Sequence, residues 1–135
     1  MALNPYLVFD GNTREVVEFY AKVFGTEEPN FMTFGSVHSE EELPPGTKDL
    51  IMHTNLEIAG SKLMFSDNFP GMEYREGNNF TLAYISSDEA AMKDAFEKLK
   101  EGGTVQMELQ EVPWSKMYGS LTDKYNIQWQ FNYEA

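Results

Sequence analysis

The sequence contains no cysteine and only two histidines among its 135 residues. Without cysteine the chain cannot form a disulfide, a thiolate metal site or a cysteine nucleophile, so several enzyme classes are excluded. It also lacks an apolar run approaching the ~20 residues that a membrane span needs. Basic residues are scarce, because 10 Lys and Arg stand against 22 Asp and Glu for a net charge of -12. Such a charge repels nucleic acid and anionic lipid, so we expect neither nucleic acid nor a membrane as a partner.

Several familiar motifs are also missing. The sequence has no glycine-rich loop of the Rossmann type, no P-loop, no GxSxG element, no EF-hand loop and no HExxH. The N-terminal residues carry no basic segment, and Asn4, Pro5 and Asp10 interrupt their apolar run, which is not typical of a signal peptide. We therefore expect a cytoplasmic protein. The length predicts a single domain over residues 1–135.

The first half of the chain alternates strand signals with one strong helix signal. Asn12 and Glu15 have the spacing of a capping box, and Gly25 supplies a helix stop after a broad apolar stripe. A run with glycine, two prolines and three successive glutamates predicts a solvated loop over 35–49. The predicted elements are a strand over 5–9, a helix over 13–24, a strand over 28–34 and a hairpin of 50–58 and 61–66.

The second half repeats this order. A strand over 80–85 precedes a capping box formed by Ser86 and Glu89, which predicts a helix to about residue 100. The apolar face of this helix has the spacing i, i+3, i+4, i+7. It consists of Met92, Ala95, Phe96 and Leu99. Three strands follow, over 104–110, 116–121 and 126–132.

Each half is therefore strand, helix, strand, strand, strand. The predicted fold is α+β, with two βαβββ modules of about 4–67 and 79–133. Neither small sheet can bury both faces alone, so we expect the two to form one curved mixed sheet with the helices on its convex side.

The strand NIQWQFN, residues 126–132, alternates apolar residues with carboxamides. Alternation predicts a half-buried strand whose core face carries Ile127, Trp129 and Phe131. The opposite face then carries Gln128, Gln130 and Asn132. The same period puts His53, Asn55 and Glu57 opposite the core in the strand over 50–58, and Thr104, Gln106, Glu108 and Gln110 in the strand over 104–110. The concave side of the sheet should be polar and rich in amides.

Four stretches resemble the PhnB-like branch of the vicinal oxygen chelate superfamily, which includes glyoxalase I, bleomycin-resistance proteins and extradiol dioxygenases. They are PYLVFDGNTREVVEFYAKVFG (5–25), MHTNLEIAGSKLMFSD (52–67), EKLKEGGTVQMELQEVPW (97–114) and YGSLTDKYNIQW (118–129). The resemblance covers nearly the whole chain and implies a glyoxalase-like fold and a homodimer. The chain departs from the pattern at Ser115, where glycine is usual after tryptophan, and at Asn126, where glycine is usual in the last turn. Asparagine tolerates the left-handed conformation better than other non-glycine residues, so this turn can be kept.

Enzymes of this superfamily hold a divalent metal with His and Glu side chains from the first and last strands of each half. The resemblance places the corresponding positions at Pro5, Met64, Asn79 and Gln130, and none is a histidine or a carboxylate. We therefore expect no metal and no other cofactor. His53 and Glu57 are four residues apart on one strand, about 13 Å between Cα atoms at ~3.3 Å per residue, so both would have to stretch toward one ion. His53 with Glu108 is another possible pair.

Single residues allow two interpretations each. His53 matches a histidine usual in PhnB-like sequences and is the one candidate acid or base, with hydrogen bonding across the sheet as its structural alternative. Asp67 at a strand end favours a turn cap. Trp114 and Tyr118 suit the wall of a pocket, whereas Trp129 lies on the core side.

The sequence therefore predicts a protein that binds a small organic ligand in a polar, amide-lined cup without an obligatory metal. The predicted ligand-binding residues are His53, Asn55, Gln106, Trp114, Tyr118, Gln128 and Gln130. One alternative is a metal-dependent lyase, isomerase or dioxygenase of the glyoxalase type. Another is a structural or interaction dimer with a vestigial pocket.

Overall fold

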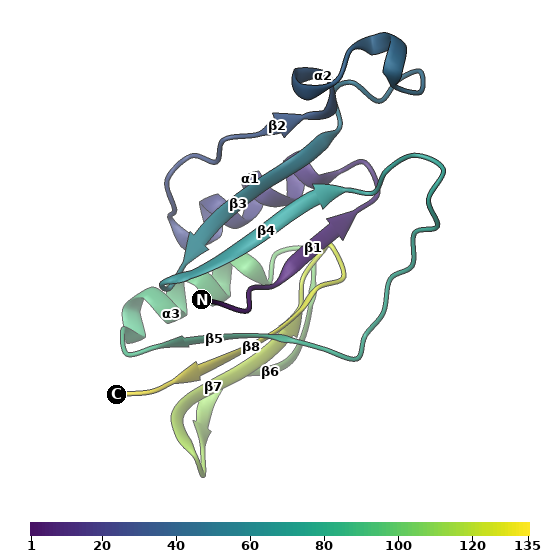
Figure 1. The fold of residues 1–135 in the computed structure, drawn as a ribbon. Helices are drawn as coiled ribbons and strands as arrows, with labels where there is room; N and C mark the ends of the chain where they lie inside the picture. The colour runs from purple at the N-terminus through teal and green to yellow at the C-terminus, as the bar shows by residue number, and fades with distance from the viewer. The chain divides into compact units, whose positions relative to one another are not determined.

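Two compact units make up the chain, Met1–Arg75 and Glu76–Ala135. The computed structural model describes residues 1–135. Both units follow the order strand, helix, strand, strand, strand, with a short additional helix in the first unit (Figure 1). The boundary between them lies in the interval between the two predicted modules. No helix is long and apolar enough to cross a membrane.

The first unit packs one long helix on a four-stranded mixed sheet. Its elements are β1 (Tyr6–Phe9), α1 (Thr13–Phe24), β2 (Met32–Thr33), α2 (Phe34–Val37), the 3₁₀ turn η1 (Glu40–Glu42), β3 (Ile51–Ile58) and β4 (Ser61–Asp67). The strand order is β1-β4-β3-β2, with β1 parallel to β4 and the other neighbours antiparallel. Helix α1 lies behind the sheet in Figure 1 and contacts β3 and β4. Tyr20 of this helix and Phe65 of β4 are fully buried, with ring centroids 6.0 Å apart.

The second unit has the same topology. Its elements are β5 (Leu82–Ser86), α3 (Glu89–Leu99), β6 (Thr104–Val112), β7 (Ser115–Thr122) and β8 (Gln128–Tyr133). The strand order β5-β8-β7-β6 again puts the first strand parallel to the last. Phe96 of α3 contacts Phe131 of β8 edge to face, at 5.3 Å between ring centroids. The predicted α+β fold with two βαβββ modules is thus confirmed, as two mixed four-stranded sheets.

Helix α1 begins and ends where the sequence predicts, but its start is not stabilised as predicted. Asn12 makes no side-chain capping bond, because its backbone (φ -115°, ψ 18°) is not the extended conformation of a usual N-cap. Asp67 takes this role from the end of β4, since its Oδ1 accepts from the backbone N–H groups of Gly11 and Thr13, both at 3.0 Å. Its Oδ2 accepts from Ile51 at 2.8 Å. Asp67 is buried, so one carboxylate joins three segments of the first unit.

Helix α3 buries the predicted face, but the prediction of its N-cap is wrong. Met92, Ala95, Phe96 and Leu99 are all buried. Asp88 is the N-cap, and its side chain accepts from the backbone N–H of Ala91 at 3.0 Å. Ser86 is the last residue of β5, and its Oγ accepts from the N–H of Asp88. The strand therefore runs to the position where the box was predicted, and the helix starts two residues later.

The strand predicted over 28–34 is mostly absent. Only Met32 and Thr33 form β2, which shows an irregular register where it pairs with β3. Pro29 has no N–H to donate, and the C=O of Asn30 accepts from the hydroxyl of Thr54 at 2.8 Å instead of from a backbone ladder. The predicted loop over 35–49 contains most of α2 and the turn η1.

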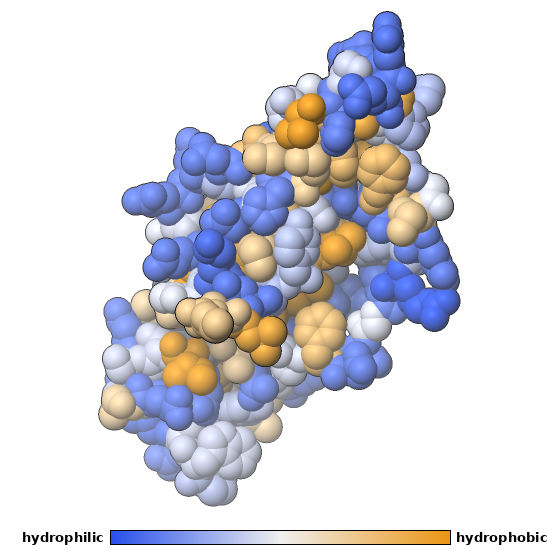
Figure 2. All heavy atoms as spheres, in the orientation of Figure 1, coloured by the Kyte–Doolittle hydropathy of each residue, from blue (hydrophilic) through white to orange (hydrophobic).

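The hairpin turns confirm the turn chemistry. Ala59 and Gly60 both have positive φ, 52° and 83°, as a two-residue hairpin of the primed type requires. Asn126 has φ 68°, so asparagine does adopt the left-handed conformation in the last turn. Asp123 is buried in that turn and accepts from the N–H groups of Tyr125 and Ile127 and from Nε1 of Trp129. Hydrophilic side chains dominate the surface visible in Figure 2, with smaller hydrophobic patches between them.

Candidate functional site

One face of the first sheet is free of the helix. The register places Tyr6 of β1 and Asn55 of β3 on either side of Met64 in β4, so all three share this face. The alternating residues Leu56 and Ile58 are buried on the other face. The prediction that the polar residues of β3 lie opposite the core is therefore confirmed by the burial pattern of this strand.

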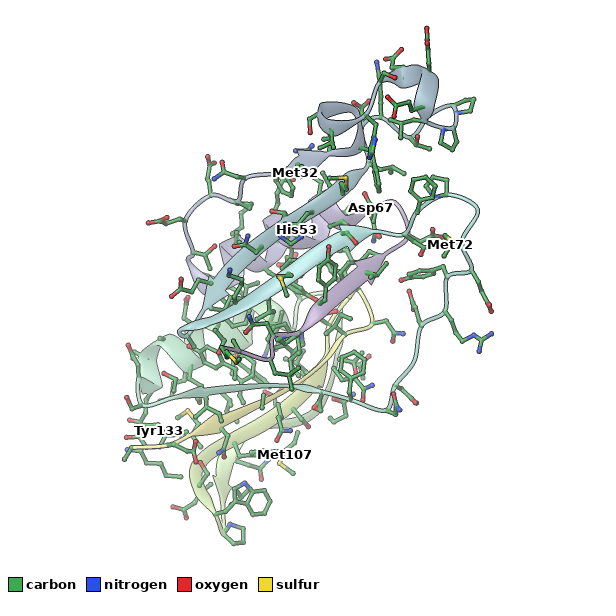
Figure 3. The ribbon with its side chains drawn as sticks, viewed as in Figure 1. Met32, His53, Asp67, Met72, Met107 and Tyr133 are labelled. Atoms are coloured by element: carbon green, nitrogen blue, oxygen red, sulfur yellow. The ribbon has the colours of Figure 1, made fainter.

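His53 on this face is held by Tyr6. A hydrogen bond of 3.1 Å joins Tyr6 Oη to His53 Nδ1, and the two rings lie 5.7 Å apart with an interplanar angle of 40°. His53 is half-buried, and Tyr6 is 46% exposed. Figure 3 shows His53 on the face of β3 that points away from α1. Because Nδ1 is engaged, Nε2 is the ring nitrogen left for a ligand, and the phenol limits how the imidazole can turn.

The second sheet carries a row of neutral polar side chains on one face. Cross-strand pairing places Thr122 opposite Gln128, Ser120 opposite Gln130 and Tyr118 opposite Asn132. All six side chains are half-buried. The opposite face of β8 carries Trp129 and Phe131, which are buried as predicted.

Hydrogen bonds within this row already orient part of it. Tyr118 Oη donates to Gln130 Oε1 at 3.2 Å, and Gln106 Nε2 donates to Thr122 Oγ1 at 3.0 Å. Trp114 meets the ring of Tyr118 edge to face, at 5.3 Å between centroids and 74° between planes, and is 64% exposed. The Nε2 amide group of Gln130 takes no part in the Tyr118 bond and can donate to an acceptor.

The predicted ligand-binding residues fall into two groups. His53 and Asn55 belong to the first unit, where they lie two residues apart on the same face of β3. Gln106, Trp114, Tyr118, Gln128 and Gln130 belong to the second unit, and the register places most of them on one sheet face.

Comparison with known proteins shows the family of this chain. Residues 1–132 match the sequence family described as 3-demethylubiquinone-9 3-methyltransferase. The chain belongs to this family. The predicted PhnB-like relationship is confirmed, because a structure from Bacillus cereus described as a putative 3-demethylubiquinone-9 3-methyltransferase, PhnB protein, covers 99% of this chain and all of that one, with a TM-score of 0.76 and 23% identity.

Two further relatives span the chain almost end to end. Protein YjdN of Escherichia coli is 33% identical over 140 residues, which cover 98% of this chain and 95% of YjdN. The crystal structure of protein PA1353 from Pseudomonas aeruginosa is 32% identical, covers 99% of this chain and 98% of that one, and has a TM-score of 0.85. A glyoxalase/bleomycin resistance protein/dioxygenase family enzyme from Burkholderia phytofirmans, at 15% identity and a TM-score of 0.63, covers 96% of this chain and 95% of that one, and shows that this chain has the glyoxalase-like fold.

The resemblance implies metal ligands on the first and last strands of each half, and the strand register shows which residues pair there. In the first unit Met64 of the last strand lies opposite Tyr6 of the first strand. In the second unit Gln130 occupies the equivalent place and lies opposite Ala83. A thioether, a phenol, a methyl group and an amide thus stand at these four positions.

The sequence prediction named Pro5, Met64, Asn79 and Gln130 as the four positions. The C=O of Pro5 accepts from the N–H of Met64 at 3.1 Å, so these two residues are neighbours in the first unit. Asn79 precedes β5, which begins at Leu82. No group of three or more His, Asp or Glu side chains that could hold a metal ion occurs in the structure.

The carboxylates considered as partners of His53 have other neighbours. Glu57 lies opposite Lys62 in the β3–β4 ladder. Glu108 lies 3.9 Å from Lys100 Nζ, at the end of helix α3. The pKa of Lys100 is raised, first by its hydrogen bond to Glu97 and further by the charge of Glu108.

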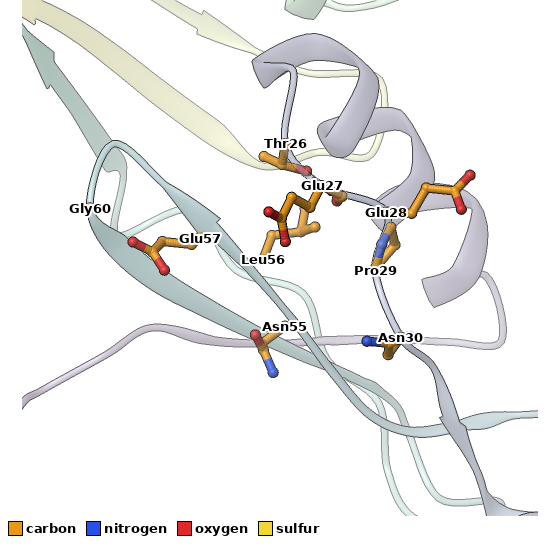
Figure 4. Close-up of a pocket in the computed structure, with 9 residues that line it drawn as sticks. All are labelled: Thr26, Glu27, Glu28, Pro29, Asn30, Asn55, Leu56, Glu57 and Gly60. Carbon is orange, nitrogen blue, oxygen red and sulfur yellow. Dashed lines mark hydrogen bonds between the residues drawn. The ribbon is translucent and has the colours of Figure 1, made fainter.

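A hollow of about 510 Å³ opens elsewhere in the first unit, beside β3 (Figure 4). One wall is the chain after α1, residues 26–30, and the other is the end of β3 with its turn. Glu27 and Glu57 both line this space. The side chain of Glu27 extends toward β3, whereas that of Glu28 points away from it (Figure 4). The sequence does not predict this hollow, because its pattern indicates a continuous strand over 28–34, where part of one wall lies.

Sequence analysis also missed Tyr6, Ser120 and Thr122 as members of the polar faces. The sequence predicts only that Tyr6 belongs to a strand. Its partner His53 is 47 residues away, so no local pattern connects the two side chains. The signal that could have found Ser120 and Thr122 is the alternation of small polar residues with Gly119 and Leu121 along β7.

Proposed function

We propose that this protein binds a small organic ligand on the helix-free faces of its sheets, through hydrogen bonds and without an obligatory metal. The ligand-binding side chains are His53 and Asn55 in the first unit. In the second unit they are Gln106, Trp114, Tyr118, Gln128 and Gln130.

The observation that carries this proposal is the replacement of metal-ligand types by neutral groups at the paired strand positions. Met64 and Gln130 are equivalent in the two units, and neither supplies the charge or basicity that a dication needs. An amide offers both a donor and an acceptor to an organic ligand. Half-burial of Gln130 supports the same role, because a partly desolvated amide gains more from a well-placed partner than an exposed one.

His53 adds a second kind of recognition. Its Nδ1 is bonded to Tyr6, so Nε2 is available as one fixed contact for a ligand. The neighbouring side chains Val8 and Met64 are apolar and share this face by register. A ligand with a polar end and an apolar body would match these groups.

Thermal unfolding with a panel of small metabolites tests the proposal. A ligand at 100 times its dissociation constant adds ~2.7 kcal/mol, which raises the melting temperature of a domain of this size by roughly 8 °C. We expect Gln130→Ala and His53→Ala to weaken binding of a hit. Asn78→Ala is the matched control, because Asn78 is exposed and lies outside the helices and strands.

Elemental analysis of protein purified without a chelator tests the metal-free part. A stoichiometric transition metal that is lost in Gln130→Ala would favour the metal-dependent enzyme instead. A flat thermal response across a broad panel, with no metal, would favour the structural dimer.

A further inference from the structure

Strand β3 has one edge that nothing in its sheet occupies. Toward β4 it is paired from Thr54 to Ile58, but toward β2 the pairing ends at His53. Because Ala59 and Gly60 form a two-residue turn, Ile58 and Ser61 are the pair that exchanges hydrogen bonds at its base. Alternate residues of an antiparallel strand direct N–H and C=O to the same neighbour, so Asn55 and Glu57 direct theirs away from β4.

The second unit shows what a closed edge looks like. There β6 pairs with β7 along its length, from Thr104 opposite Thr122 to Val112 opposite Ser115. The equivalent partner of β3 is β2, which has only two residues. The first sheet therefore lacks most of a strand that the second sheet has.

The chain beside this edge does not replace the missing strand. Pro29 has no N–H, and Asn30 gives its C=O to the side chain of Thr54. The hollow of about 510 Å³ separates this segment from Asn55 and Glu57 (Figure 4). The space therefore lies directly along the unpaired backbone groups.

Charge indicates what kind of segment fits. Glu27 and Glu57 are exposed, line the hollow and form no ion pair. The whole chain carries a net charge of -12, which disfavours a second copy of itself at this edge. A positively charged segment meets attraction from both carboxylates.

We propose that the open edge of β3 binds an extended, arginine- or lysine-rich segment of a partner protein, which pairs with the backbone of Asn55 and Glu57 and completes the first sheet. The segment pairs with the backbone edge of β3, whereas the small ligand is assigned to side chains on the helix-free face, where Asn55 contributes its amide. Backbone pairing supplies the affinity, and the two glutamates select for positive side chains.

Fluorescence anisotropy at low salt with labelled six-residue peptides of alternating arginine and threonine tests the proposal. We expect the same peptide with N-methylated backbone amides to bind about tenfold more weakly, because it cannot donate to the ladder. Glu27→Gln and Glu57→Gln should each weaken binding about threefold. Glu28→Gln is the matched control, because its side chain points away from the hollow and its substitution should leave binding unchanged.

Amide hydrogen exchange gives a second, independent readout. In the free protein the amides of Asn55 and Glu57 should exchange much faster than those of Leu56 and Ile58, which face β4. The peptide should slow the first pair only. Equal binding of the N-methylated peptide, displacement by spermidine without any change in exchange, or no binding by any arginine- or lysine-rich peptide would overturn the proposal. Slow exchange at Asn55 and Glu57 in the free protein would overturn it as well.

Discussion

Asp67→Ala should be among the most destabilising single substitutions in the first unit. The carboxylate accepts from three backbone N–H groups, those of Gly11, Thr13 and Ile51, at 3.0, 3.0 and 2.8 Å. Asp67 is only 4% exposed, so water cannot replace these bonds without local opening. A hydrogen bond to a charged group contributes about 1.5 to 3 kcal/mol, but such contributions are not additive. Removal of one partner from a buried charged group costs about 3 to 5 kcal/mol, which is the loss we expect here.

Asp67→Asn separates the contribution of the negative charge to stability from that of the side-chain shape. The asparagine oxygen can still accept from Gly11 and Thr13, but its amide nitrogen then faces the N–H of Ile51, donor to donor. We expect a loss of about 2 kcal/mol, between the wild type and the alanine variant. Asp10→Asn is the control, because Asp10 is exposed and adjacent in sequence. It should change the free energy of unfolding by less than about 0.5 kcal/mol.

Urea denaturation followed by far-ultraviolet circular dichroism measures these changes. Both tryptophans, Trp114 and Trp129, lie in the second unit, so their fluorescence reports on that unit alone. Hydrogen exchange at the amides of Thr13 and Ile51 reports on the first unit. A loss below about 1 kcal/mol for Asp67→Ala, with those two amides still protected, would refute the assignment of Asp67 as the residue that joins these segments.

Three other predictions concern single positions. Asp123→Ala should destabilise the second unit by about 3 kcal/mol and shift the emission of Trp129, whose Nε1 donates to this carboxylate at 2.9 Å. Gly103→Ala should cost several kcal/mol in chemical denaturation, because its Cβ would lie 2.3 Å from a backbone oxygen, whereas Gly77→Ala meets nothing closer than 3.8 Å and should be neutral. The pKa of Glu42 is lowered from 4.5, first by the hydrogen bond from the serine three residues earlier. Its support of η1 is therefore present above pH 4.5 and lost as the pH falls through the lowered value, which amide exchange in this turn measures.

Helices and strands whose apolar residues repeat at a regular spacing were predictable from the sequence. The alternation in NIQWQFN assigned Trp129 and Phe131 to the core and Gln128 and Gln130 to the other face, as the structure has them. Side-chain direction in a strand repeats every two residues, so a neighbour in sequence carries the information. The buried face of α3 was predictable for the same reason, at helical period.

Contacts between distant segments were not predictable in this way. Asp67 accepts from Gly11, 56 residues away, and Tyr6 meets His53 across 47 residues. Neither contact produces a pattern within a short stretch of sequence, because each depends on which strands become neighbours in the sheet. The shortened β2 is different, since Pro29 was visible in the sequence and argues against a paired strand at that point.

Strand β3 has the two-residue partner β2 on its outer side, whereas the equivalent strand β7 has the long partner β6. Equivalent positions in β3 and β7 should therefore tolerate substitutions differently. Asn55 and Ser120 occupy the same place in the two repeats, since each lies opposite the residue at the centre of its last strand. Ser120 belongs to a strand with neighbours on both sides, so a proline there removes a ladder bond. A proline at Asn55 removes none within the chain. Sequence drift that keeps the fold is therefore expected to accumulate along the exposed edge of the first repeat, unless a partner holds it in place.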